Sequence, residues 1–278
     1  MRRLLICSAL LGIVTPAFSQ DLDELIKQAD QYERNGETDL ALGSLRQAEQ
    51  VSADNPRVEK RLAREYIRKI EDAADPAARK RYGELSLELA QKAARKLPDD
   101  PEARVGLAAA YGKMLEMVDD KTKIEYSRRV YAEATRGVAL DPNNDFGHLI
   151  IARWNFEMAS LNPVMKGFAQ IVYGRFPTAS KEEAVVEFKK AIQLAPERIT
   201  HHAECAKVLD ALGEKDAAHR EWAKVTVLKA TDSQDRRYQA AAIERLKSPA
   251  SVPAEQILPD LLGPDKSGST RNAVGNLP

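Results

Sequence analysis

The sequence has little of what a disulfide-stabilised or all-β protein needs. Its 278 residues include only 2 cysteines, 14 glycines and 6% aromatic residues. So few glycines and aromatics argue against a β-sandwich, whose strands and turns use both. The 42 basic residues are matched by 42 acidic ones, so the formal net charge is zero. A neutral chain does not bind nucleic acid by general electrostatic attraction, and we predict no nucleic-acid partner.

The sequence also lacks the motifs of the common enzymes. It has no P-loop, no glycine-rich dinucleotide fingerprint, no His-Glu-x-x-His and no paired cysteines. Residues 201–205 combine two histidines, Glu204 and Cys205, which are the right ligand types for a metal. Adjacent residues of a helix point about 100° apart, however, and Cys205 falls on an expected core position. We therefore predict no catalytic residues, no cofactor and no metal site.

The first residues differ in character from the rest of the chain. After a basic start, residues 4–14 carry no charge, and small residues stand at the −3 and −1 positions before Gln20. This is the plan of a secretory signal peptide, and the uncharged run is too short to span a membrane as a helix. We expect residues 1–19 to be cleaved before Gln20. The mature protein is then periplasmic or secreted, with no transmembrane segment.

From Leu22 to about Leu246 the pattern predicts one helix after another. Apolar residues recur at spacings of three and four among alanine, leucine and charged helix formers. The breaks are short, and in each an Asp or Asn able to cap a helix stands beside a proline. These breaks are Asp54-Asn55-Pro56, Asp75-Pro76, Asp99-Asp100-Pro101 and Asp141-Pro142-Asn143-Asn144.

The helices show a tetratricopeptide-type repeat. Ala184, Phe188 and Ala191 fit its second helix, where small residues alternate with a large apolar one so that helices pack closely. The repeat length of about 34 residues leads to further apolar residues. These are Ala218, Trp222 and Val225.

The repeat predicts an all-α fold with a defined extent. We expect a tetratricopeptide-type α-solenoid of antiparallel helix pairs over residues 20–247. Its C-terminal capping helix should run roughly from Gln234 to Lys247. Residues 248–278 are rich in Pro and Ser and poor in apolar residues, so we expect a disordered tail there.

The first helices of such a repeat line a concave groove, and their outward positions usually contact a ligand. Arg153, Lys113 and Lys207 would hold a carboxylate or phosphate of a partner protein or peptide through charge-assisted hydrogen bonds. The alternative is a solvated helix face, balanced by Asp210 and Glu157. The predicted groove residues are Lys113, Arg153, Phe156, Lys207 and Asp210.

An apolar insertion, residues 161–180, interrupts the repeat and ends at a capping box of Ser180 and Glu183. One interpretation is that the insertion folds back into the solenoid core. The other is a lid over a cavity for a lipid tail or a peptide side chain. The apolar residues on which both depend are Phe168, Ile171, Tyr173 and Phe176.

Four stretches of the second half carry a more specific signal. They are HLIIARWNFE at 148–157, FPTASKEEA at 176–184, the alanine-centred helix Phe188–Pro196, and the helix around Trp222. In this order they resemble the regulator of microtubule dynamics family of tetratricopeptide-type proteins. The resemblance covers about 100 residues well, and the first 150 only through general architecture.

The resemblance implies a helical-repeat adaptor rather than an enzyme. Eukaryotic members of the family associate with microtubules or organelle membranes, and at least one is linked to phospholipid binding. An exported bacterial chain does not meet microtubules, so the fold carries over better than the function. We predict an exported, non-catalytic scaffold that binds a partner protein or peptide in its concave groove. The alternative is a carrier of lipid or another apolar ligand that uses residues 161–180.

Overall fold

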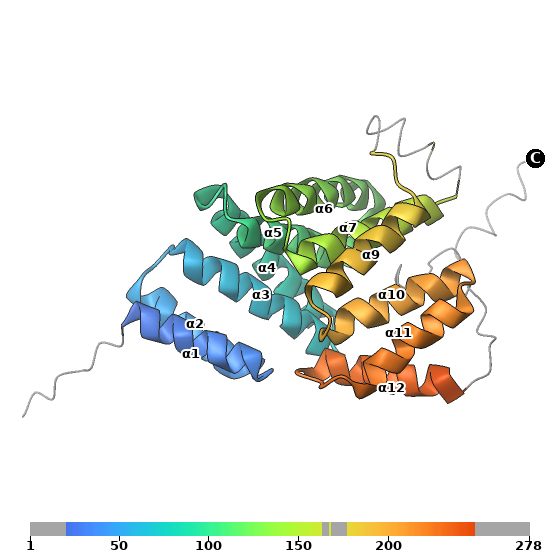
Figure 1. The fold of residues 1–278 in the computed structure, drawn as a ribbon. Helices are drawn as coiled ribbons and strands as arrows, with labels where there is room; N and C mark the ends of the chain where they lie inside the picture. The colour runs from blue at the N-terminus through green and yellow to red at the C-terminus, as the bar shows by residue number, and fades with distance from the viewer. Residues whose placement is uncertain (1–20, 163–166, 168–176, 248–278) are drawn as a thin grey trace, which may run out of the picture.

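The computed structural model describes residues 21–162, 167 and 177–247, and this part of the chain contains helices and no strand (Figure 1). The predicted all-α fold is confirmed. The helices are α1 (Leu22–Arg34), α2 (Thr38–Val51), α3 (Pro56–Asp72), α4 (Pro76–Lys96), α5 (Pro101–Met114), the short 3₁₀ helix η1 (Leu115–Met117), α6 (Asp120–Leu140), α7 (Asp145–Ser160), α9 (Lys181–Leu194), α10 (Ile199–Leu212), α11 (Lys215–Val227) and α12 (Ser233–Lys247).

Proline and a capping side chain set the start of three helices, as the sequence predicts. A proline is the first residue of α3, α4 and α5, where its missing N–H leaves no hydrogen bond unmade. The residue before it caps the helix by accepting hydrogen bonds from the first turn. The capping side chains are Asn55, Asp75 and Asp100, with Asn144 and Ser180 in the same role for α7 and α9.

The helices pack as successive pairs. α1 packs on α2, α3 on α4, α5 on α6, α7 on α9 and α10 on α11, while α12 covers α10 and α11 as a single final helix. The first helices of neighbouring pairs also touch: α3 with α5, α5 with α7, α7 with α10, and α10 with α12. This is the arrangement of an α-solenoid, and α12 is the capping helix that the sequence predicts.

The core follows the repeat. Ala184, Phe188 and Ala191 of α9 have no exposed surface, and Trp222 of α11 is buried in the same cluster. Small residues allow α9 and α11 to approach their neighbours, and the large aromatic residues fill the remaining space. Two further clusters occupy the α1–α3 end and the middle of the solenoid.

The two ends of the solenoid meet. Gly36, in the turn between α1 and α2, lies against the loop before α12 so closely that a Cβ atom there would be 2.4 Å from the carbonyl oxygen of Thr231. Ser233 donates a hydrogen bond to Asp72 at the end of α3, and Arg237 lies 3.5 Å from the same carboxylate. Figure 1 shows the start of α12 beside the α1–α2 hairpin.

Substituting Gly36 should reveal how much this contact contributes. Gly36 has φ +73°, so alanine there adopts a left-handed conformation at a cost of about 1–2 kcal/mol, and overpacking against Thr231 adds about 1–3 kcal/mol. We expect Gly36→Ala to lower the free energy of unfolding, measured in urea, by about 2–5 kcal/mol.

The matched control is Gly213→Ala. Gly213 has φ +82°, but no atom lies within 4 Å of the position that its Cβ would occupy, so only the cost of the left-handed backbone applies. Equal losses in the two variants would show that the contact between the solenoid ends contributes nothing.

Several predicted segments lie outside the described residues. They include the signal peptide at 1–19 and the tail at 248–278. The same holds for the apolar side chains on which the lid interpretation depends, namely Phe168, Ile171, Tyr173 and Phe176.

Candidate functional site

The first helices carry a row of polar side chains on the side where they contact one another, which we call the inner charge row. Its ion pairs and hydrogen bonds join α3 to α5, α7 to α10, and α10 to α12. The row consists of Glu71 on α3, Lys113 on α5, Arg153 and Glu157 on α7, Glu204 and Lys207 on α10, and Tyr238 on α12.

Glu204 is the centre of the inner charge row, and only 2% of the residue is exposed. The Tyr238 hydroxyl donates to its Oε1 at 2.6 Å, Lys207 Nζ donates to the same oxygen at 3.2 Å, and Arg153 Nε lies 3.4 Å from Oε2. Burial raises the pKa of Glu204, but the charges of Arg153 and Lys207 and the Tyr238 hydroxyl outweigh it and lower the pKa to about 2. Glu204 is therefore a buried, ionised carboxylate.

Arg153 keeps hydrogen-bonding capacity. Its Nη2 is 3.9 Å from Glu157 Oε1, and within the described part of the chain its guanidinium makes ion pairs but no hydrogen bond. Water reaches it, because 38% of the side chain is exposed. Burial raises the pKa of Glu157 to about 7 although the charge of Arg153 opposes the rise, so Glu157 is partly protonated near neutral pH. The guanidinium of Arg153 is therefore held by two ion pairs, and its N–H groups remain available to donate hydrogen bonds.

The structure brings two of the predicted cations together and separates the others. Arg153 and Lys207 meet on Glu204, whereas Lys113 forms its own ion pair with Glu71 at 2.6 Å. The protein itself thus supplies a carboxylate to these cations: Glu204 pairs with Arg153 and Lys207, and Glu71 pairs with Lys113. Glu157, which the solvated-face alternative names as a balancing charge, forms an ion pair with Arg153.

The prediction for Phe156 is wrong, because this residue is only 3% exposed and belongs to the C-terminal core. α7 is covered by α9 and by α10, which leaves no room for an aromatic groove residue there. Asp210 has a structural role instead. It accepts a hydrogen bond from Trp222 Nε1 at 2.8 Å and lies 3.4 Å from Arg245.

Sequence reasoning missed Glu204 and Tyr238 as partners. The signal was present, since these residues are 34 positions apart, which is one repeat. Equivalent positions of successive first helices lie side by side in a solenoid. A polar pair at that spacing therefore predicts a contact between α10 and α12.

The residues of the discounted metal cluster are held separately. His201 Nε2 lies 2.7 Å from Asp145 Oδ2, and His202 Nδ1 lies 2.6 Å from Glu221 Oε2. Cys205 belongs to the core, as predicted, and burial raises the pKa of its thiol to about 12. Within the described residues no group of three or more possible ligands is placed to hold a metal ion.

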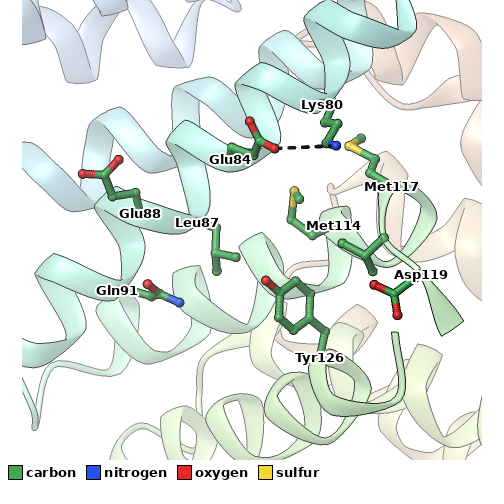
Figure 2. A pocket seen from close by; sticks show the side chains of 10 residues that line it. Lys80, Glu84, Leu87, Glu88, Gln91, Met114, Met117, Asp119 and Tyr126 are labelled. Carbon is green, nitrogen blue, oxygen red and sulfur yellow. Dashed lines mark ion pairs between the residues drawn. The ribbon is translucent and has the colours of Figure 1, made fainter. Parts of the chain in front are cut away.

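A second feature is a pocket of about 440 Å³ between α4, the end of α5 with η1, and the start of α6 (Figure 2). None of the predicted groove residues lines it. Its lining combines apolar and acidic side chains: Lys80, Glu84, Leu87, Glu88, Gln91, Met114, Met117, Val118, Asp119 and Tyr126.

Comparison with known families decides where this helical repeat belongs. The sequence model of the family described as "Regulator of microtubule dynamics protein 1-3" matches residues 25–250, which include every helix described above except the first turn of α1. The chain belongs to this family. The match extends the resemblance seen in the second half to nearly the whole solenoid.

Individual members of the regulator of microtubule dynamics family are distant from this chain in sequence. A regulator of microtubule dynamics protein 3 from Xenopus laevis is 26% identical over 204 residues, which are 71% of this chain and 42% of that protein. A human regulator of microtubule dynamics protein 2 is 24% identical over 136 residues, which are 49% of this chain and 33% of that protein. The chain thus spans less than half the length of these relatives.

A solved structure supports the fold independently. A tetratricopeptide-repeat protein of Thermus thermophilus superposes with a TM-score of 0.58 at 16% sequence identity, and the match covers 81% of this chain and 100% of that one. The tetratricopeptide-type solenoid fold is therefore shown. None of the described helices is both long and apolar enough to cross a membrane.

Proposed function

We propose that this protein is an exported, non-catalytic scaffold that binds a segment of a partner protein along the inner charge row. The observation that carries the proposal is the state of Arg153. Its guanidinium lies between the carboxylates of Glu157 and Glu204 and donates no hydrogen bond within the described part of the chain, and 38% of the Arg153 side chain is exposed. A planar guanidinium with free donors is suited to a carboxylate, which it binds through two parallel hydrogen bonds.

The chemistry of the row favours an acidic partner segment. A carboxylate arriving at Arg153 would meet Glu157, whose pKa burial raises to about 7, so protonation of Glu157 relieves the repulsion. Lys113, on the neighbouring first helix, has 31% of its side chain exposed and offers a second cation. An aspartate or glutamate side chain, or a C-terminal carboxylate, fits these groups.

Export is the second part of the proposal. It is supported by the order of a basic start, an uncharged stretch and small residues before Gln20. An exported chain would be recovered from the periplasm with the mass of residues 20–278. Recovery with the mass of the full chain in the cytoplasm would contradict this part alone.

Photo-cross-linking tests the binding proposal. A photoreactive residue replaces Ala109, one turn before Lys113 on α5, and a second, control variant carries it at Val186 on the exposed face of α9. We expect a discrete partner to cross-link at position 109 and not at 186. Arg153→Gln should lower that yield about tenfold or more, since a charge-assisted hydrogen bond contributes about 1.5–3 kcal/mol.

The conservative variant completes this test. Arg153→Lys retains the positive charge without the planar fork, so it should keep part of the yield. A yield unchanged by Arg153→Gln, in a variant whose helical circular dichroism is intact, would refute binding through the inner charge row. The carrier alternative depends on residues 161–180, most of which lie outside the described part of the chain.

A further inference from the structure

The pocket of Figure 2 is built from the second helices α4 and α6 together with the end of α5 and η1, and none of its lining residues belongs to the inner charge row. α4 and α6 both pack on α5, and the 3₁₀ turn η1 connects the end of α5 to the loop before α6. Its apolar surface comes from Leu87 and Met114, which are buried, with Met117 and Tyr126 partly exposed beside them. Methionine side chains adapt their shape to an aliphatic guest.

The rim of the pocket is acidic. Three carboxylates, Glu84, Glu88 and Asp119, line it against one ammonium group, Lys80. Lys80 neutralises Glu84 poorly, because the two are 3.9 Å apart, both are well exposed, and lysine precedes glutamate in the less favourable order for a helix. Glu88 has a closer partner in Lys92 at 2.7 Å.

The electrostatics of two side chains at the pocket agree with a negatively charged rim. Hydrogen bonds from Thr122, followed by those from other first-turn groups of α6, lower the pKa of Asp119, so this carboxylate stays ionised. Burial raises the pKa of Tyr126, and nearby Tyr111, Glu125 and Glu84 raise it further. The negative charges of Glu84 and Glu125 thus act on the Tyr126 hydroxyl.

From this combination we propose that the pocket binds a lysine or arginine side chain of a partner polypeptide. The aliphatic part of such a side chain would pack on Met114, Met117 and Leu87, while its cation would remain at the acidic rim beside Glu84 and Asp119. The volume of about 440 Å³ falls within the range of ordinary ligand sites. The scaffold then has a site for a basic residue in addition to the carboxylate site at Arg153.

Methyl NMR with ¹³C-methyl methionine tests the proposal directly, because two methionines line the pocket and Met158 on α7 does not. The probe is a glycine pentapeptide with a central arginine, acetylated and amidated so that its only charge is on the side chain. We expect saturable shifts of the Met114 and Met117 signals and none of Met158. Central norleucine should bind about fivefold more weakly or worse, and central glutamate should not bind, because the rim is acidic.

Matched variants identify the groups responsible. Glu84→Gln should weaken the arginine peptide about fivefold, and adding Asp119→Asn should weaken it further while keeping the helix cap, since asparagine also caps. Glu182→Gln, on the exposed start of α9, is the control for a lost surface charge. Arg153→Gln should leave the titration with the arginine peptide unchanged, because Arg153 does not line the pocket. A negative result for the pocket is therefore distinct from a negative result for binding along the inner charge row.

Four results would overturn the proposal. The first is the absence of saturable shifts with the arginine peptide, and the second is an equal response to the glutamate peptide. The third is tighter binding of spermidine than of the arginine peptide, which would identify a free polyamine rather than a polypeptide as the guest. The fourth is full affinity for the arginine peptide in the double variant Glu84→Gln with Asp119→Asn, which would show that the acidic rim does not bind the cation.

Discussion

Arg153→Glu is expected to lower the free energy of unfolding by about 3 kcal/mol, the low end of the range for removing a partner of a buried charge. Glu204 is 2% exposed and depends on Arg153 and Lys207 to stay ionised. A glutamate at position 153 removes one of these cations and adds a negative charge beside Glu204 and Glu157. We place the loss at the low end because water reaches Arg153 and screens the interaction.

Urea unfolding of three variants at position 153 measures this effect. We expect the loss of stability to increase from Arg153→Lys to Arg153→Gln to Arg153→Glu, because the charge next to Glu204 goes from positive to neutral to negative. If Arg153→Glu were as stable as the natural protein, Glu204 could not be an ionised group held by Arg153. The expected instability is also the reason why binding is best tested with Arg153→Gln.

The second large effect is on pH dependence, and it comes from Glu65 on α3. Only 1% of Glu65 is exposed, neither carboxylate oxygen has a hydrogen-bond partner within the described residues, and Arg68 Nε is 3.7 Å away. Burial raises the pKa of Glu65 from 4.5 to about 7, against the charge of Arg68. Between these two values the folded protein holds more protons than the unfolded chain, so stability falls as pH rises.

The expected loss is about 2–3 kcal/mol between about pH 5 and pH 8, because a shift of one pKa unit corresponds to about 1.4 kcal/mol. Glu157, whose pKa is raised by burial, acts in the same direction. Glu204 acts in the opposite direction, but its lowered pKa places its effect below about pH 4.5, outside this window.

Chemical unfolding at several pH values checks the assignment to Glu65. Glu65→Gln cannot ionise, so it should reduce the dependence to the part that Glu157 contributes and be more stable than the natural protein at about pH 8, by about 2 kcal/mol. Glu182→Gln, on the exposed start of α9, is the control and should keep the full dependence. If the free energy of unfolding of Glu65→Gln depended on pH as strongly as that of the natural protein, ionisation of Glu65 would cost the folded state no free energy.

The helical content, several helix starts and the repeat follow from the amino-acid sequence alone. Helix starts at Asn55-Pro56, Asp75-Pro76 and Asp100-Pro101 depend on capping and on the fixed φ of proline, which act within one turn. Burial of Phe188 and Trp222 follows from a spacing that recurs along the chain. Such features are local or periodic, and a linear sequence displays both directly.

Which charged groups meet depends on the three-dimensional packing of the helices. The residues of the inner charge row come from five helices. Their contacts depend on the rotation of each helix about its own axis relative to the next helix. The repeat is interrupted before α9, so its spacing does not specify this rotation. For this reason the sequence grouped Arg153, Lys113 and Lys207 around a ligand, whereas in the structure Arg153 and Lys207 meet on the buried carboxylate of Glu204 and Lys113 pairs with Glu71. Phe156 was misplaced for the same reason, since a small rotation of α7 exchanges a core position for a groove position. The meeting of the solenoid ends at Gly36, and the pocket between α4 and α6, depend on the summed curvature and spacing of all the pairs, to which no single stretch of sequence corresponds.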